Sequence, residues 1–178
     1  MNAPKAKKID QLLEIHNDKR NDPYFWMNER ENPEVIQYLE DENAYTNFVM
    51  KETEDFQNDL YEEMKARYKK DDESLPYFFN GYWYIVKYEA GKEYPIFARK
   101  FQTLESAQEI LLDVNILAEG EAFFETGSMS VSVNNDIMAY STDNVGRRIY
   151  KIYFKNLKTG EIYPDIIENA TGKAVWAN

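Results

Sequence analysis

The run Val131-Ser132-Val133-Asn134-Asn135-Asp136-Ile137-Met138-Ala139-Tyr140-Ser141 decides how this chain folds. Apolar and small polar residues alternate on both sides of Asn134-Asn135-Asp136, which are residues that favour turns. Such alternation about a turn predicts an antiparallel hairpin. Ile149 to Phe154 and Glu161 to Asp165 follow as two further runs. The sequence therefore predicts a four-stranded antiparallel sheet from Val131 to Asp165.

A second unit of the same kind precedes this sheet. Its runs are rich in aromatic and β-branched residues, and turn residues such as Asn80-Gly81 separate them. The predicted strands are Tyr77 to Phe79, Tyr82 to Tyr88, Tyr94 to Phe101 and Glu109 to Asp113. The two units repeat with a period of roughly fifty residues, which is in the range of β-propeller blades.

Near the end of the chain, Ala174-Val175-Trp176 resembles the beginning of another strand. A natural domain seldom ends inside a new strand, so we expect a piece of a longer protein. The expected fold is an α+β fragment: N-terminal helices followed by about two four-stranded antiparallel blades of an incomplete β-propeller. Isolated blades would leave flat apolar faces uncovered, and self-association would follow. We expect those faces to expose Tyr84, Val86, Ile152, Phe154 and Trp176.

The first part of the chain is predicted to be helical. Asn32-Pro33-Glu34 is a strong helix start, and neither Gly nor Pro follows until Pro76. A run of this length favours two helices with a bend near Thr53. The predicted domains are residues 1–75, an arm and helices, and residues 76–178, the blades. One helical stripe is apolar or small: Leu39, Thr46, Val49, Thr53, Phe56, Leu60 and Met64.

Before the helices, two segments are interpreted from composition. Met1 to Arg20 is polar and is predicted to be a loose arm. Asp22-Pro23-Tyr24-Phe25-Trp26 is predicted to be an apolar plug that packs on a neighbouring element.

Charge and composition bound the function. The 178 residues include 21 basic and 32 acidic ones, giving a net charge of −11, and no Cys. This balance argues against binding to nucleic acids or to anionic membrane surfaces. The lack of Cys suits a reducing compartment, and Met1 to Lys8 has no apolar segment behind it, so we expect a cytoplasmic protein.

No catalytic residue, substrate-binding residue, metal site or cofactor is predicted within this chain. Its only histidine, His16, lies in the polar arm, and no Gly-x-Ser-x-Gly elbow is present. The glycines are scattered rather than grouped in a phosphate-binding loop.

Several segments, taken in order, resemble one family. The N-terminal ones are Asp22 to Trp26 and Glu42-Asn43-Ala44-Tyr45. The sheet region adds Gly81 to Tyr84, Gly91 to Ile96, Leu111 to Asn115, Ala139 to Asp143, Val145 to Tyr150, Thr159-Gly160-Glu161 and Ala174 to Ala177. Together they resemble the N-terminal portion of the prolyl oligopeptidase family of serine peptidases, closest to oligopeptidase B, also called protease II.

That resemblance implies an α/β-hydrolase domain capped by a seven-bladed propeller, with the N-terminal helices on the hydrolase side. The catalytic triad and the acidic specificity residues would lie in the C-terminal part, outside this chain. The parent would cleave short peptides after Arg or Lys by acyl transfer, and its C-terminal hydrolase domain would be the partner of this piece. The alternative is a free-standing, non-catalytic module for protein interactions.

Arg147 and Arg148 are the candidate functional residues. They lie in a predicted loop between two strands of one blade. A solvated basic pair is the simpler interpretation in an acidic protein. The functional interpretation is an ionic contact between the propeller and the hydrolase domain that helps the domains to close.

Overall fold

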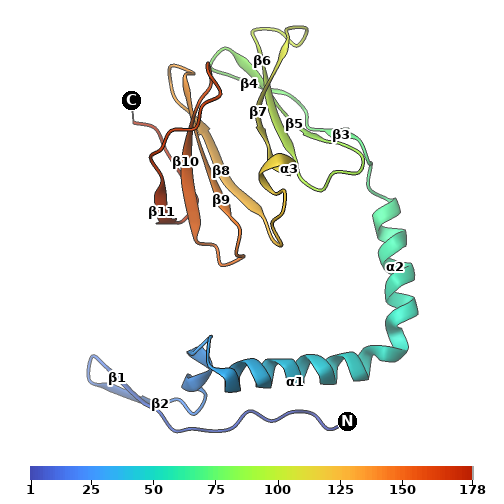
Figure 1. Cartoon of the computed structure of the whole chain (residues 1–178), viewed down its shortest axis with the longest axis vertical. Coiled ribbons are helices and arrows are strands. Elements are labelled where there is room, and N and C mark those ends of the chain that lie inside the picture. Colours follow the sequence, from blue (N-terminus) through green and yellow to red (C-terminus); the bar gives the residue numbers. More distant parts are fainter. Residues whose placement is uncertain (178) are drawn as a thin grey trace. The chain divides into compact units, whose positions relative to one another are not determined.

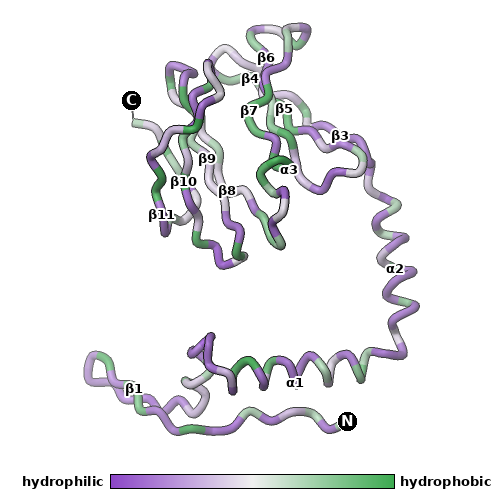
Figure 2. Tube along the Cα trace, viewed as in Figure 1, coloured by the Kyte–Doolittle hydropathy of each residue, from purple (hydrophilic) through white to green (hydrophobic). Residues whose placement is uncertain are grey.

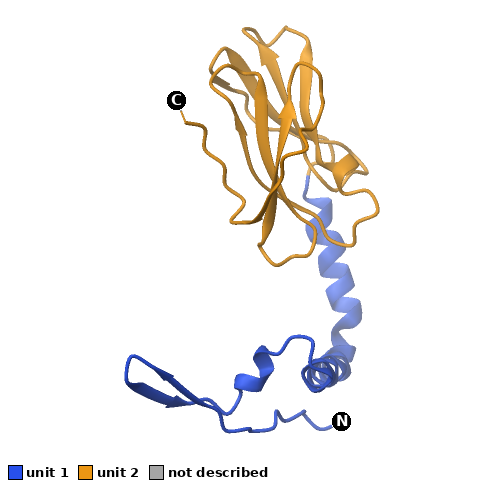
Figure 3. Cartoon of the chain, turned by 60° about the vertical axis from the view of Figure 1, so that its left-hand side comes forward, with its two compact units in different colours: residues 1–68 blue, residues 69–178 orange. Residues whose placement is uncertain are grey.

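The computed structural model describes residues 1–177, and the chain divides after Tyr68 into two units (Figure 3). The first unit holds a hairpin and helices, and the second holds two antiparallel sheets. The expected boundary was later, after residue 75. The sheets begin earlier because β3 (Asp72–Glu73) already pairs with β5 (Tyr82–Tyr88).

The N-terminal arm contains a hairpin that the sequence did not reveal. β1 (Leu12–Ile15) and β2 (Asp18–Asn21) pair in antiparallel fashion (Figure 1). His16 and Asn17 join them with φ angles of 50° and 64°, the left-handed backbone that a two-residue hairpin turn uses. The prediction of a loose arm was therefore wrong for residues 12–21. The sequence contains no signal of this hairpin, because its turn has no glycine and both strands are largely exposed.

The aromatic cluster after the hairpin packs as predicted at one residue. Trp26, in the short 3-10 helix η1 (Phe25–Asn28), is only 8% exposed. Its indole Nε1 donates a hydrogen bond to the Lys7 carbonyl at 3.0 Å. The Lys7 ammonium lies 5.4 Å from the centre of the Trp26 ring and also pairs with Glu34. Trp26 therefore fixes the arm against the start of the first helix.

The helical region is interrupted where the sequence predicted a bend. α1 (Pro33–Met50) is followed by a 3-10 turn, η2 (Lys51–Thr53), and then by α2 (Glu54–Ala66). The Asn32 side chain caps α1 by accepting a hydrogen bond from the Glu34 amide at 2.9 Å. α1 and α2 run in different directions on either side of η2 (Figure 1). Within residues 1–177, no helix is both long and apolar enough to cross a membrane.

The apolar stripe of these helices lies in solvent. Its large members are between 43% and 67% exposed, and Figure 2 shows that α2 is mostly hydrophilic around them. In the first unit, Trp26 and Val35 are the buried apolar residues among those that the structure describes.

The second unit carries the two predicted sheets. In the first, the strand order is β3-β5-β6-β7, and β4 also pairs with β5. In the second, the order is β11-β10-β9-β8. The remaining elements are β4 (Tyr77–Phe79), β6 (Ile96–Phe101), β7 (Gln108–Asp113), α3 (Val114–Leu117), β8 (Glu125–Val131), β9 (Ile137–Asp143), β10 (Tyr150–Asn156) and β11 (Ile167–Ala170).

The fourth strand of the second sheet was predicted at the wrong place. It lies at β11, whereas Glu161 to Asp165 follows a turn at residues 157–159 and pairs with β10 only through a single bridge between Lys155 and Ile162. The Asn156 side chain stabilises the turn at residues 157–159, which was predicted, by accepting hydrogen bonds from the amides of Lys158 and Thr159. Pro164, which has no amide hydrogen, also limits strand pairing in this segment.

The two sheets pack face to face and share one core, and we call this contact the seam. Tyr84 and Leu112 come from the first sheet, Met138 and Tyr140 from the second, and Val114 from α3. Figure 2 shows hydrophobic segments gathered on β7 and α3, which border this contact. The prediction that Tyr84 would be exposed was wrong, because the second sheet covers it to 6% exposure.

The segment after β11 covers part of the outer face of the second sheet. The Gly172 carbonyl accepts hydrogen bonds from the hydroxyls of Ser128 and Ser141, at 2.6 and 2.7 Å. The Trp176 ring contacts Phe154 edge-on at 6.2 Å, and its Nε1 donates to the Ser130 carbonyl at 3.0 Å. As a result Phe154 and Trp176 are half-buried.

Two more predictions are corrected by this arrangement. Ile152, expected on an exposed face, is 5% exposed, and Val86 is half-buried. Residues 171–177 run along the sheet without forming a strand, so the predicted strand at Ala174 to Trp176 is absent from the described residues. The segment instead uses its carbonyl and indole groups to bind β8 and β9.

Candidate functional site

The loop that carries the two candidate arginines is held by a buried carboxylate. Asp143, at the end of β9, is 2% exposed. Its Oδ1 accepts hydrogen bonds from the amides of Val145 and Gly146 at 2.8 and 2.9 Å. Its Oδ2 accepts one from the amide of Arg148 at 2.7 Å. These backbone donors, the Val145 amide foremost, lower the pKa of Asp143 below its usual value.

This anchor fixes the backbone of the loop while leaving the arginine side chains outside. Gly146 and Arg148 have φ angles of 80° and 56°, so the loop uses left-handed backbone at two positions. Arg147 and Arg148 are both exposed. The structure therefore places the two predicted residues together on one loop held by hydrogen bonds to Asp143, and an interdomain role for them stays a prediction.

A surface pocket of about 340 Å³ lies beside this loop. Arg147 lines it together with Ile149 and Tyr150, and Lys151 and Glu168 form part of the wall. Lys151 and Glu168 make an ion pair at 3.0 Å, and the hydrogen bond to Glu168 raises the pKa of Lys151. The pocket thus combines apolar walls with a rim of mixed charge.

A second pocket, of about 290 Å³, lies between the second sheet and the segment that joins α3 to β8, and it shares Lys151 with the first pocket. Tyr140 and Tyr153 line it as a stacked pair with ring centres 5.4 Å apart. Phe124 contributes a third aromatic ring, and Glu121 lies in the wall.

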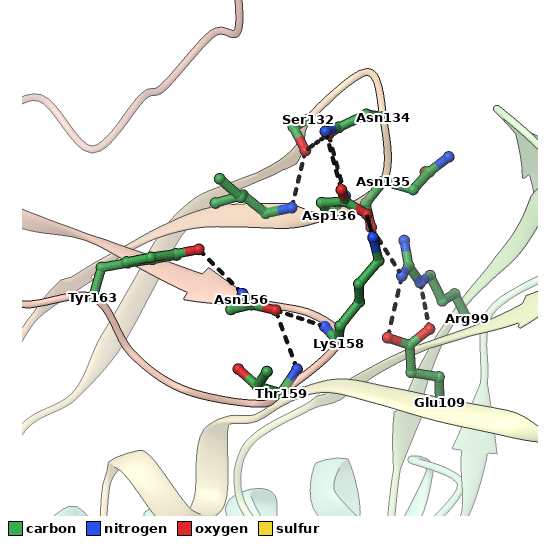
Figure 4. Close-up of polar contacts among 11 residues, drawn as sticks. Arg99, Glu109, Ser132, Asn134, Asn135, Asp136, Asn156, Lys158, Thr159 and Tyr163 are labelled. Carbon is green, nitrogen blue, oxygen red and sulfur yellow. Dashed lines mark hydrogen bonds and ion pairs between the residues drawn. The ribbon is translucent and has the colours of Figure 1, made fainter.

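Polar side chains join the sheets elsewhere along the seam (Figure 4). Arg99, on β6, is 3% exposed and pairs with Glu109 through Nε and Nη2 at 2.7 and 3.1 Å. Arg99 Nη2 also lies 3.4 Å from the Asn135 carbonyl, in the turn between β8 and β9. Asn80 donates to the Val133 carbonyl at 2.8 Å, and Lys155 donates to the Leu111 carbonyl at 2.8 Å. Hydrogen bonds therefore cross the seam in both directions.

Burial affects the charged groups of the seam differently. Burial opposes the charged form of Arg99, but the Glu109 carboxylate outweighs it and raises the Arg99 pKa. For Lys155 the order is reversed: burial lowers its pKa, and the attraction of the Glu109 carboxylate offsets only part of that effect. The Arg99 guanidinium also stacks on the Tyr82 ring, 3.9 Å from the ring centre.

Groups that could carry out chemistry are not assembled in the part of the chain that the structure describes. His16 lies in the exposed hairpin turn. Ser128 and Ser141 use their hydroxyls to bind the Gly172 carbonyl, which is a structural role. Within residues 1–177, no group of three or more His, Asp or Glu side chains could hold a metal ion.

Sequence reasoning missed two features of this region. The Asp143 anchor had a local signal, because Asp followed by Asn-Val-Gly is a typical start for a side-chain-capped turn. The contact between Arg99 and Asn135 had none, since 36 residues separate them and the partner atom is a backbone carbonyl.

Comparison with known proteins identifies the region. The family model described as the N-terminal β-propeller domain of prolyl oligopeptidase matches residues 4–178. Dipeptidyl aminopeptidase BI of Pseudoxanthomonas mexicana is 40% identical over 97% of this chain and 26% of its own length. Protease 2 of Moraxella lacunata is 33% identical over 95% of this chain and 25% of its length. The chain spans about a quarter of the length of these curated relatives.

Solved structures give the same result. Oligopeptidase B from Leishmania major matches with a TM-score of 0.87 and 29% identity, covering 98% of this chain and 27% of that one. Oligopeptidase B from Trypanosoma brucei, in a closed form with covalently bound antipain, matches with a TM-score of 0.83 and 25% identity over the same shares of both chains. The resemblance stated from the sequence is confirmed: this chain belongs to the prolyl oligopeptidase family of serine peptidases and carries the N-terminal part of its β-propeller domain.

Proposed function

We propose that the whole protein is a serine oligopeptidase that cleaves short peptides after Arg or Lys by acyl transfer. The observation that carries this proposal is the match of 98% of the chain to oligopeptidase B at a TM-score of 0.87. In such a reaction a serine attacks the scissile carbonyl, a histidine acts as base, and an oxyanion hole stabilises the intermediate. The residues for these steps would lie outside this chain, and we propose a cytoplasmic location, which cell fractionation tests.

This chain would contribute support and access control. The exposed apolar stripe of α1 and α2 would contact the C-terminal hydrolase domain of the same protein, which would shield side chains such as Phe56 that are now 67% exposed. The two sheets would form part of the propeller that excludes large substrates.

A second candidate activity rests on one comparison. The relative with 40% identity is named dipeptidyl aminopeptidase BI, which favours removal of dipeptides from a free N-terminus. The free-standing interaction module is a further alternative, and the length of the encoding reading frame separates it from both peptidases.

Peptide assays of the whole protein and of this chain test the proposal. For the whole protein we expect cleavage after Arg and Lys in N-terminally blocked peptides, and inhibition by a serine-directed phosphonate. Cleavage confined to peptides with a free N-terminus, two residues at a time, would favour the dipeptidyl activity. We expect no hydrolysis by the 178-residue chain alone, and turnover traced to a labelled serine of this chain would contradict that expectation.

The arginine pair would assist closure of the two domains. In the whole protein we expect Arg147→Ala with Arg148→Ala to lower kcat/KM a few-fold, in line with the roughly 0.2–1 kcal/mol of exposed ion pairs. Lys69→Ala with Lys70→Ala, another exposed basic pair, removes the same charge and serves as the control. Equal kcat/KM values for both double variants would contradict a role of Arg147 and Arg148 in domain closure.

We also propose that the chain alone self-associates through its uncovered apolar stripe. Several exposed apolar side chains along α1 and α2 exceed what a soluble monomer usually shows. Sedimentation tests this, and a monomer mass over a wide concentration range would argue against it.

A further inference from the structure

Three buried polar atoms at the seam have no hydrogen-bond partner among the described residues. They are the Tyr84 hydroxyl, Arg99 Nη1 and Asn135 Oδ1. Leaving such groups unsatisfied is unfavourable, so buried polar groups are nearly always paired with protein or water. Three such atoms in one region call for a common explanation.

The structure brings the three residues together around Arg99. Tyr84 and Arg99 lie directly opposite each other on β5 and β6, so their side chains share one face of the sheet. The Tyr84 hydroxyl helps to raise the pKa of Arg99, so it faces the guanidinium although the two make no hydrogen bond of ordinary geometry. Asn135 touches the same guanidinium through its carbonyl, 3.4 Å from Nη2. Its side-chain amide donates to the Asn80 carbonyl at 3.2 Å, which leaves Oδ1 as the unused atom. Figure 4 shows Arg99 between Glu109 and the Asn135 turn.

The chemistry of these atoms selects a neutral occupant. Arg99 Nη1 can only donate, Asn135 Oδ1 can only accept, and the Tyr84 hydroxyl can do either. The Arg99 charge disfavours a cation. An anion would face the Asn135 oxygen and the Glu109 carboxylate, which already neutralises Arg99. Water can accept from Nη1 and from the hydroxyl while donating to Oδ1, and buried waters typically make about three such bonds.

We propose that the seam contains a binding site for one buried water molecule, held by Arg99, Tyr84 and Asn135. The water links strands β5 and β6 of the first sheet to the β8–β9 turn of the second. It completes the polar contacts that Arg99 begins, and it does not depend on the proposed peptidase activity.

A crystal structure of the chain tests the site directly. We expect a water oxygen within about 2.7–3.2 Å of Arg99 Nη1 and of at least one of the other two atoms. A direct hydrogen bond between Tyr84 and Arg99 with no solvent density would overturn the proposal. A bromide soak with an anomalous peak at this point would also overturn it, because the occupant would then be an anion.

A matched pair of variants tests the site in solution through the sign of the effect. Tyr84→Phe removes one partner of the water, so we expect the midpoint of urea unfolding to fall. If the site were empty, the same change would remove an unsatisfied buried hydroxyl and raise the midpoint. Tyr140→Phe is the control, because its ring is equally buried and stacked, while its side chain lines the open pocket. If the Tyr84→Phe variant unfolds at the same urea concentration as the Tyr140→Phe variant, or at a higher one, the result contradicts the water site.

Discussion

The two units of the chain treat apolar side chains in opposite ways. In the unit up to Tyr68, the helices keep their apolar stripe in solvent, and Trp26 and Val35 are its buried apolar residues. In the unit from Lys69 onward, two sheets bury Leu111, Val114 and Met138 completely at the seam. The comparison teaches that amphipathic periodicity shows which face will be covered, but not whether the cover belongs to the same part of the chain.

The largest effect should separate the two kinds of apolar position. Met138→Ala removes a fully buried side chain from the seam, and we expect it to lower the free energy of unfolding by about 2–5 kcal/mol. Phe56→Ala, on the exposed face of α2, should change it by about 0.5 kcal/mol or less. Urea unfolding of both variants measures the difference. Similar losses would show that the helical stripe is covered after all.

A glycine at the outer face of the second sheet gives the next effect. Gly172 has φ +83°, and an added Cβ would lie 2.8 Å from the Tyr150 ring. Gly91 has nearly the same φ, +81°, but nothing within 4 Å of an added Cβ. Both Gly→Ala variants incur about 1–2 kcal/mol of backbone strain. Gly172→Ala should cost about 1–3 kcal/mol more, because the Tyr150 ring or the segment must also move.

Equal melting temperatures for these two glycine variants would contradict the packing of residues 171–177 on the sheet. If the extra cost of Gly172→Ala over Gly91→Ala disappears when Tyr150 is also changed to Ala, the contact with Tyr150 is its cause. Residues in contact show such non-additive effects, whereas the effects of distant residues usually add.

The smallest effect concerns acid stability at the Asp143 loop. Because the folded-state pKa of Asp143 is lowered, its contribution to stability is present above the ordinary aspartate pKa of about 3.9 and is lost as the pH falls through the folded value. Asp143→Asn should therefore reduce the loss of stability between neutral pH and pH values below about 4. Urea midpoints along this pH range measure it. The same reduction with exposed Asp165→Asn would mean that the effect is not specific to the loop.

The sequence predicted the parts that depend on local patterns. The cap at Asn32 and the interruption near Thr53 were correct because composition and length determine them. The turn around Asn134 to Asp136 and the strand after it followed from alternation, but the strand before it, predicted at Val131 to Val133, is β8 and ends at Val131. The fourth strand was misplaced because Glu161 to Asp165 has the composition of a strand but makes only one bridge, at Ile162, and Pro164 has no amide hydrogen for further pairing.

Predictions about exposure failed where distant residues meet. Tyr84 and Ile152 were assigned to open faces, but the neighbouring sheet and the segment after β11 bury them. The candidate loop was located correctly. The role of Asp143, which accepts hydrogen bonds from the amides of this loop, was not predicted. Local spacing is enough to identify a loop. Contacts across the seam, such as that between Arg99 and Asn135, join residues 36 positions apart and are visible only in the three-dimensional structure.

The hydrogen bond from Lys155 to the Leu111 carbonyl makes the reactivity of this lysine depend on contact between the two sheets. The amine has a lowered pKa, so at a given pH more of it is uncharged and nucleophilic than in an ordinary lysine. While the sheets are closed, its 2.8 Å hydrogen bond engages that amine. When the sheets part, that bond and the burial are lost and the pKa of the amine returns toward that of an ordinary lysine, so we expect the rate of Lys155 labelling, read by mass spectrometry against exposed Lys69, to change with how often the two sheets separate.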